Sequence, residues 1–222
     1  KYIVKELCKE KEKLFIRNYR KRDILDLYNN QELLRNIIFD RLIGTKYIKY
    51  YINTRYLLLL IRANNKNKLV KKILELIEEY KNEERYKYLL DKEEYKECFL
   101  EACRYNSEIA KYILDSEWCN NELVNQVNVL DENCLIIACQ YNHYLAKHIL
   151  KSKWCSKELV NKVDSHGRNC LMYARLNLNY IKLVKYILEC KWCNKELVNC
   201  LNVANIYNSE LLDYIYKYYE EN

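Results

Sequence analysis

The sequence predicts an all-α solenoid of about five to six stacked helix pairs, the first two of them degenerate. A Trp-Cys dipeptide recurs at positions 118, 154 and 192, with spacings of 36 and 38 residues, and the segment NELVN or KELVN follows it each time. A second pattern, an apolar segment that opens on cysteine, starts at Cys98, Cys134, Cys170 and Cys200. Because many positions recur in register, we expect the chain to be built from copies of one structural unit.

The units start near residues 22, 58, 98, 134, 170 and 200. The expected organisation is an N-terminal cap or basic tail over 1–21, degenerate helical repeats over 22–94, and clear repeats over 95–222 that end in a capping helix. In the degenerate part, apolar pairs such as Leu69-Val70 match the pair Ile109-Ala110 of the clear copies. The last segment, LLDYIYKYYEEN, has an apolar side formed by Leu211, Leu212, Ile215, Tyr216 and Tyr219. Docking to another helix is the alternative role of that side.

Each clear unit holds two segments of helix length. The first is short and apolar, as in CLIIA from Cys134, and the second carries the pairs Leu145-Ala146 and Ile149-Leu150. Apolar pairs four residues apart form one buried stripe on a helix. The asparagine of RYN or QYN between the two segments suits a helix end or an N-cap, and Ser107 and Ser209 fit the same capping pattern.

A third segment follows the second helix in each unit. In KSKWCSKELVN, the piece SKEL can start a further short helical turn, and KVDSHGRN then forms a projecting loop with Gly167. Neighbouring units must cover each other's apolar stripes, since one unit cannot bury its own. The recurring tryptophans are expected to fill the gap between units, so that Trp154→Ala would cost about 3–5 kcal/mol if the ring is buried. Close approach of two helices is expected at Ala102, Ala138, Ala174 and Ala204.

This architecture resembles the ankyrin repeat. The segment DSHGRNCLMYA is similar to the family pattern D-x-x-G-x-T-P-L-H-x-A, and its matching residues are Asp164, Gly167, Leu171 and Ala174. Asn169 and Cys170 stand where the family has Thr and Pro, and Asp131 takes the glycine position in the preceding unit. The unit is about three residues longer than the family's usual 33. The composition is rich in Asn, Lys, Ile and Tyr, the residues of A/T-rich codons. This composition and the long unit resemble the ankyrin-type proteins of large DNA viruses.

The resemblance implies a non-catalytic protein–protein interaction module. It places the variable contact positions at the loop tips and just after the alanine of each inner helix: Arg104, Tyr105, Val129, Leu130, Glu132, Gln140, Tyr141, Ser165, His166, Arg168, Leu176 and Asn177. Val129 and Leu130 are two apolar residues at an expected exposed tip. They serve either as a hydrophobic anchor for a partner or in packing against the neighbouring tip, and both interpretations stay open.

The eleven cysteines and three histidines do not form a recognisable catalytic or metal-binding pattern. Cys190 and Cys193 are formally a CxxC, but zinc needs two further ligands at suitable spacing, and Cys193 is the third member of the Trp-Cys series. The repeat favours packing as the role of most cysteines over a metal or redox role. His148 takes a position held by tyrosine in sister units, and His166 lies on a loop. We therefore expect no enzyme activity, no metal and no cofactor.

Charge is distributed unevenly along the chain. Residues 1–90 contain 22 Lys and Arg against 12 Asp and Glu, a net charge of +10, whereas the remainder has a net charge of −3. The densest basic run, Arg17–Arg22, includes Tyr19, so nucleic-acid or acidic-surface binding is the alternative function.

The longest apolar run, Tyr56–Ile61, is far shorter than the about 20 residues that span a bilayer. With no secretion signal recognised, we expect a monomeric protein of the cytoplasm, or of the host-cell cytoplasm if viral, with a protein partner and no membrane association.

Overall fold

The computed structural model describes residues 54–64, 67–80, 92–174, 180–194, 198 and 209–221. All of them lie in one compact unit, Asn53–Asn222. The predicted tail over 1–21 and most of the first degenerate repeat lie outside the described residues. No helix among the described residues combines the length and the apolar character that are needed to cross a membrane.

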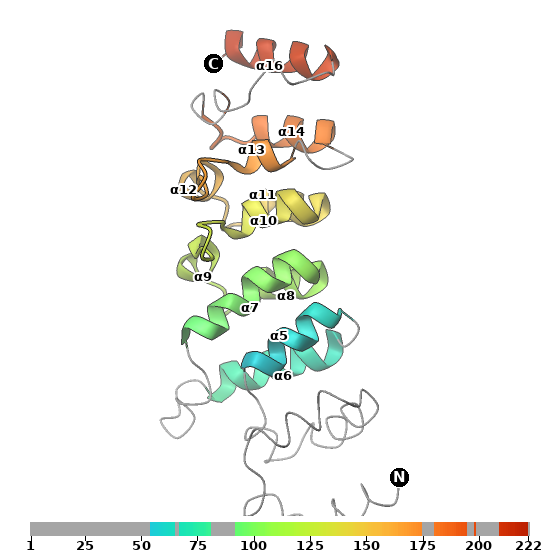
Figure 1. The fold of residues 1–222 in the computed structure, drawn as a ribbon, viewed down its shortest axis with the longest axis vertical. Helices are drawn as coiled ribbons and strands as arrows, with labels where there is room; N and C mark the ends of the chain where they lie inside the picture. Colours follow the sequence, from blue (N-terminus) through green and yellow to red (C-terminus); the bar gives the residue numbers. More distant parts are fainter. Residues whose placement is uncertain are drawn as a thin grey trace, which may run out of the picture. The chain divides into compact units, whose positions relative to one another are not determined.

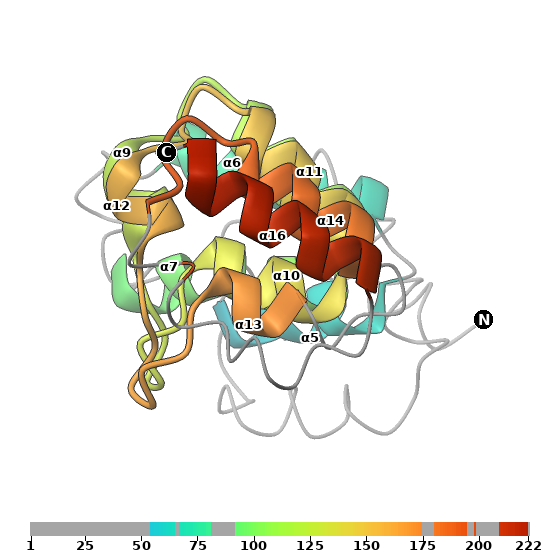
Figure 2. The same ribbon diagram turned by 90° about the horizontal axis from the view of Figure 1, so that it is seen from above.

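The described helices form successive pairs along the chain: α5 (Thr54–Ala63) with α6 (Asn67–Tyr80), α7 (Lys92–Tyr105) with α8 (Ser107–Asp115), α10 (Cys134–Tyr141) with α11 (His143–Lys151), and α13 (Cys170–Ala174) with α14 (Tyr180–Leu188). Within this unit the pairs stack in layers (Figure 1), and α16 (Ser209–Glu221) packs on α14. Seen along the stack, the inner helices α5, α7, α10 and α13 form one column and the outer helices form another (Figure 2). The fold is thus the all-α helical solenoid that the repeats predicted.

In two of the described units a single asparagine makes the turn between the paired helices. Asn106 separates α7 from α8, and its side chain accepts a hydrogen bond of 3.2 Å from the N–H of Ile109. Its own N–H bonds to the carbonyl of Ala102 at 2.8 Å, which closes the preceding helix. Asn142 makes the same two kinds of contact between α10 and α11. The asparagine is therefore the N-cap, and the predicted cap Ser107 is instead the first residue of α8.

The core follows the predicted stripes. Leu145, Ala146, Ile149 and Leu150 are the buried residues of α11, whereas α10 is buried over the whole run Cys134–Cys139 because it is covered by α7, α11 and α13. Ala102, Ala138 and Ala174 are completely buried, and Ala204 lies outside the described residues. The absence of side-chain bulk at these alanines suits the close packing of inner helices in successive layers.

In two of the described units the third segment forms a short helix followed by a β-hairpin-like loop. The short helices are α9 (Asn121–Asn125) and α12 (Lys157–Val160), capped by Asn120 and Ser156, and they contact each other in neighbouring units. Antiparallel bridges Val127–Asn133 and Val163–Asn169 then close the bases of two hairpins. The Trp-Cys and ELVN segment that makes the unit long is thus an extra column of short helices beside the helix pairs.

Asparagine amides tie one layer to the next. Asn133 donates from Nδ2 to the carbonyl of Leu159 at 2.8 Å, and Asn161 donates to the carbonyl of Trp192 at 2.7 Å. Asn106 reaches Asn67 in the preceding layer at 2.7 Å. These bonds satisfy polar groups at positions that the stack removes from water, and they fix the register between layers.

Six of the described cysteines are buried: Cys98, Cys103, Cys119, Cys134, Cys139 and Cys170. The thiol of Cys134 donates to the carbonyl of Val124 at 3.5 Å, and Cys170 contacts Val160 in the same way at 3.4 Å. These six side chains therefore serve packing, as the repeat indicated. Among the described residues, no cluster of three or more His, Cys, Asp or Glu side chains is arranged to hold a metal ion.

The tryptophans do not fill a buried gap. Trp118, Trp154 and Trp192 are all only half-buried at the edge of the stack. Trp154 does bridge two layers, because its indole N–H donates to the carbonyl of Leu114 at 3.0 Å. The prediction that Trp154 lies between two units is therefore confirmed, but the prediction that its ring is buried is wrong. With part of the ring in water, the cost of Trp154→Ala falls to about 2 kcal/mol, roughly half the figure for a buried indole.

We expect Trp154→Phe to lower the free energy of unfolding by about 1 kcal/mol, because the carbonyl of Leu114 at the end of α8 loses its partner. Trp192→Phe is the matched control, since the indole N–H of Trp192 has no hydrogen-bond partner in the described part of the chain. Urea denaturation of the full chain measures both changes. Equal losses in the two variants would show that the indole N–H of Trp154 does not contribute.

Candidate functional site

Each hairpin is organised by one polar side chain at its start. In the first hairpin, Oδ1 of Asn128 accepts bonds from the N–H groups of Leu130 and Glu132 at 2.9 and 3.0 Å. In the second, Oδ1 of Asp164 accepts from His166 and Arg168, both at 2.8 Å. A short polar acceptor at this position holds the turn from inside, so the tips are pre-formed rather than loose.

The tips also need one residue with positive φ. Gly167 has φ of 72°, and Asp131, which takes the glycine position in the preceding hairpin, has φ of 60°. Aspartate is among the few residues other than glycine that tolerate this left-handed region. The loss of glycine at 131 therefore leaves the hairpin shape intact.

Neighbouring hairpins run side by side (Figure 2). The N–H of Ser165 donates to the carbonyl of Leu130 at 2.9 Å, which joins the two tips through their backbones. The side chain of Val129, in contrast, is 99% exposed, and Leu130 is exposed too. Packing against the neighbouring tip therefore accounts for the backbone of Leu130 but not for the side chain of Val129.

A buried polar network lies behind the tips. Glu132, expected as an exposed tip residue, is only 3% exposed. Its carboxylate accepts from Nδ2 of Asn128 at 2.7 Å and from the guanidinium of Arg104 at 3.3 Å. The hydroxyl of Tyr173 lies 3.2 Å from Glu132 and 2.8 Å from Asp164, so its single proton serves two carboxylates, with the shorter contact to Asp164. Glu132 is thus a structural residue, because charged and polar partners from two other layers enclose it.

The second carboxylate of the network is held in its ionised form. Burial alone would raise the pKa of Asp164, but hydrogen bonds from the backbone and guanidinium of Arg168, from Tyr173 and from the backbone of His166 lower it to about 2. The guanidinium of Arg168 donates to Asp164 at 2.9 Å and lies 5.0 Å from the ring centre of Tyr173. Burial and the nearby Asp164 raise the pKa of Tyr173, which keeps its proton at neutral pH. The network supports the hairpins, with Asp164 ionised and Tyr173 protonated at neutral pH.

The predicted helix-end residues lie on the same side as the hairpins. Tyr105 and Tyr141 are the last residues of α7 and α10, and both are exposed, with Tyr141 at 48%. The guanidinium of Arg104 lies 5.2 Å from the ring centre of Tyr141, which fixes that ring beside the hairpin network. Ser165 and His166 are exposed, while Gln140 and Arg168 are half-buried, and Leu176 and Asn177 lie outside the described residues.

Comparison with known families identifies the repeats. Residues 99–199 match the family model for ankyrin repeats, in three copies. This segment belongs to the ankyrin-repeat family. No curated protein and no solved structure matches the chain. Ankyrin repeats are in general non-catalytic modules for protein–protein interaction, because their stacked units present an extended surface.

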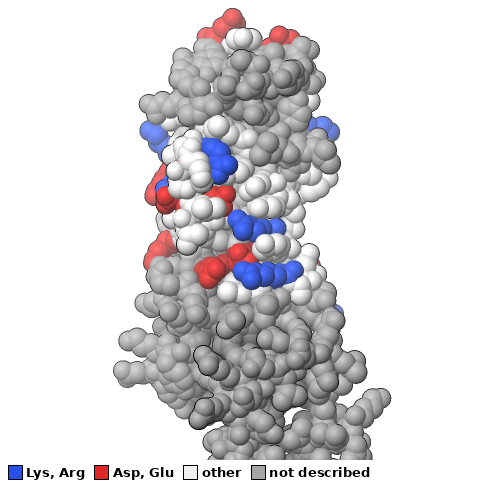
Figure 3. Space-filling view, viewed as in Figure 1, with Lys and Arg blue, Asp and Glu red and all other residues white. Residues whose placement is uncertain are grey.

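Charge on this ankyrin surface is mixed. Figure 3 shows the side of the unit that carries the inner helices, and acidic and basic side chains alternate over its described residues. A surface that binds nucleic acid would show one sign, because phosphate contacts dominate such binding. The basic run Arg17–Arg22, on which the alternative function depends, lies outside the described residues.

Three residues that support the hairpins were not predicted to do so from the sequence, namely Asn128, Asp164 and Tyr173. The sequence does contain a signal for Asn128 and Asp164. They stand 36 residues apart at equivalent positions of two repeats, and both side chains carry an oxygen that can accept hydrogen bonds. Tyr173 has no such signal, because the equivalent residue of the preceding ankyrin repeat is the apolar Ile137. Its role depends on two carboxylates that only the stacked layers bring together.

Proposed function

We propose that the chain binds another protein through the hairpin tips and the C-terminal ends of the inner helices. The observation that supports this most strongly is Val129, an apolar side chain with 99% exposure on a hairpin whose shape is fixed from inside. The fold gains nothing from that side chain. An aliphatic group presented on a rigid support is the kind of anchor that contributes much of the binding energy at interfaces.

The surroundings of Val129 suit the same role. Tyr105 and Tyr141 add exposed aromatic surface on the inner-helix side, and tyrosine is enriched in interfaces because a stiff ring offers both apolar area and a hydroxyl. The hydrogen-bonded hairpins and the buried network need little ordering on binding, which lowers the entropic cost of association. Charged groups of both signs supply a polar rim that selects the partner.

The proposed contact set is narrower than the one that the family resemblance implied. It consists of Tyr105, Val129, Leu130, Tyr141, Ser165 and His166, with Leu176 and Asn177 as further members predicted from the sequence. Arg104, Gln140 and Arg168 lie half-buried at its border. Glu132 is left out because it is buried and bonded within the chain.

A comparative capture experiment tests the proposal. The tagged chain, the double variant Val129→Asp/Tyr141→Ala and the control Tyr144→Ala are each used to capture proteins from cell lysate, followed by quantitative mass spectrometry. Tyr144 is a matched control, since it is a tyrosine on the outer helix α11 with 68% exposure. We expect a set of proteins that the wild type and Tyr144→Ala retain equally and that the double variant loses by about tenfold or more.

Two further measurements keep the result interpretable. Far-UV circular dichroism checks that all three chains are equally helical, and a parallel capture with nuclease added separates protein contacts from nucleic-acid bridging. If the double variant captured the same proteins in the same amounts, the proposed surface would be wrong. If nuclease released all captured material, the alternative function through nucleic acid would be favoured instead.

A further inference from the structure

Two thiols from successive repeats lie in contact at the edge of the stack. Sγ of Cys155 is 3.8 Å from Sγ of Cys190, although the two residues are 35 positions apart in the chain. Both side chains are half-buried, unlike the six packing cysteines of the core. The pair is therefore close enough for its sulfur atoms to meet after small side-chain rotations, and open enough for a small reagent to enter.

The repeat itself shows that packing does not require a thiol at position 190. In the two preceding units the same place, just after the outer helix, is held by Ser116 and Ser152. Both serines donate from Oγ to the carbonyl three residues earlier, at 2.6 and 2.7 Å, and so finish the helix. In the third unit Cys190 replaces the serine. Its sulfur lies against the sulfur of Cys155, the cysteine of the Trp-Cys pair in the preceding unit.

The surroundings favour reaction at Cys190. The pair lies in a notch of about 470 Å³ whose lining includes three cations, Lys151, Lys153 and Lys191, and one carboxylate, Glu189. Either sulfur of the pair can donate to the other. The contact with Cys155 and hydrogen bonds from the backbone of Trp192 and Cys193 lower the pKa of Cys190, although burial opposes the change. The same contact raises the pKa of Cys155. Thiolate character and nearby cations are what make a cysteine reactive.

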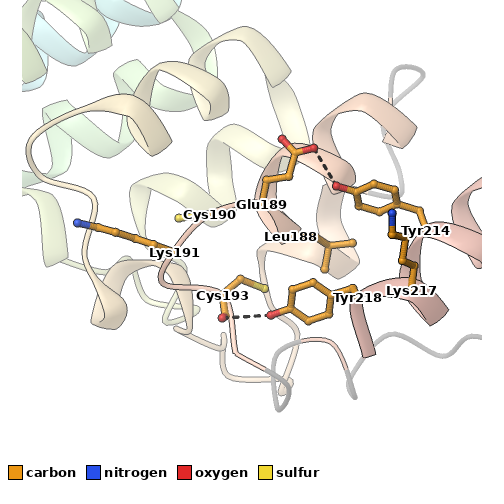
Figure 4. A pocket seen from close by; sticks show the side chains of 8 residues that line it. All are labelled: Leu188, Glu189, Cys190, Lys191, Cys193, Tyr214, Lys217 and Tyr218. Carbon is orange, nitrogen blue, oxygen red and sulfur yellow. Dashed lines mark hydrogen bonds between the residues drawn. The ribbon is translucent and has the colours of Figure 1, made fainter. Parts of the chain in front are cut away.

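The formal CxxC partner, Cys193, takes no part in this pair. In Figure 4 the sulfur of Cys193 lies toward Tyr218 of α16, whereas the sulfur of Cys190 lies on the side away from α16. Burial raises the pKa of Cys193 to about 11. The reactive partner of Cys190 is thus the cysteine of the preceding repeat, which the spacing in the sequence does not indicate.

We propose that Cys190 and Cys155 form a thiol–disulfide exchange site that reacts with anionic low-molecular-weight disulfides of the glutathione type. The thiolate of Cys190 attacks one sulfur of the disulfide, a mixed disulfide forms, and one glutathione leaves as thiolate and takes up a proton. The thiol of Cys155 then loses its proton and attacks the sulfur of Cys190, which releases the second glutathione. The two protein thiols are oxidised to one disulfide and the reagent disulfide is reduced to two thiols.

The product adds a covalent bond between two layers that also meet through packing and through the contacts of Lys147 and Lys151 with the ring of Tyr186. Closing the sulfur–sulfur distance from 3.8 Å to the bond length of about 2.05 Å requires a movement that half-buried side chains can make. Cross-linking residues 35 positions apart restricts the unfolded chain. We therefore expect oxidation to raise the thermal midpoint of the full chain by about 5–10 °C.

The test is to incubate the reduced full chain with oxidised glutathione and to map thiols and disulfides by non-reducing peptide mass spectrometry. The expected product is a Cys155–Cys190 cross-link that has lost two hydrogen atoms. Cys155→Ser should stop the reaction at a mixed disulfide on Cys190. Cys190→Ser, which restores the residue of the sister units, should abolish both products, while Cys193→Ser should react as the wild type does.

Three outcomes would overturn the proposal. One is a cross-link between Cys190 and Cys193, or adducts spread over all half-buried cysteines. Another is wild-type reactivity in Cys190→Ser. The third is a mixed disulfide in wild type that never passes to the cross-link, because Cys155 would then not be the resolving thiol. The wild-type map alone decides the first and third cases, so the test does not depend on the folding of any variant.

Discussion

Replacing Asn133 with alanine is expected to lower the free energy of unfolding by about 2–4 kcal/mol. The side chain is 2% exposed and has two functions. Its Oδ1 accepts from the N–H of Ile136 at 2.9 Å, which caps the inner helix α10, and its Nδ2 donates to the carbonyl of Leu159 in the next repeat at 2.8 Å. Loss of the cap costs about 1 kcal/mol, and the orphaned buried carbonyl adds about 1–3 kcal/mol.

Two variants separate these contributions in urea denaturation. Asn120→Ala removes a cap of the same kind, a 2.8 Å bond to the N–H of Leu123, from an exposed asparagine. It should cost about 1 kcal/mol or less. Asn133→Ser keeps an acceptor for the cap but lacks the amide that reaches Leu159, so its loss should be intermediate. If Asn133→Ala were no more harmful than Asn120→Ala, the bond between layers would carry no net stability.

The stacking of the helix pairs could be predicted from the sequence because it depends on local periodicity. Apolar pairs four residues apart form a stripe within one helix, and a repeat of that stripe in register requires layers that cover each other. Asn106 and Asn142 were recognisable for the same reason, since a cap acts within three residues of its own position. Interactions of short range leave their signal in a single unit.

The interior of the candidate site was not predictable in this way. Glu132 sits at a tip position in the alignment, yet Arg104 and Tyr173, 28 and 41 residues away, enclose it. The partner of Cys190 was not predictable either. The CxxC spacing indicates Cys193 as its partner, whereas the stacking of repeats places Cys155 against it. Trp154 shows that a recurring aromatic residue predicts the boundary between units but not how deeply the ring is buried.

Tyr173→Phe is expected to lower the free energy of unfolding by about 1.5–3 kcal/mol, although only one oxygen atom is removed. The hydroxyl is the donor to Asp164 at 2.8 Å and lies 3.2 Å from Glu132, and both carboxylates are buried. Tyr112→Phe is the matched control, because its hydroxyl also donates to a carboxylate, Glu75 at 3.1 Å, but in an exposed place. That variant should lower the free energy of unfolding by less than about 1 kcal/mol in urea denaturation.

An acid titration distinguishes the hydrogen bond of Tyr173 from the packing of its ring. The folded chain holds the pKa of Asp164 at about 2, below the ordinary value of about 3.9, so its stabilisation is present above about pH 4 and is lost as the pH falls toward about 2. In Tyr173→Phe one of the bonds that lower this pKa is gone. The pKa of Asp164 moves up, less stabilisation remains to be lost, and the gap in stability between wild type and variant should narrow between about pH 4 and pH 2. A gap that stays constant over this range would assign the effect to altered packing, and the buried carboxylates would then not depend on the hydroxyl.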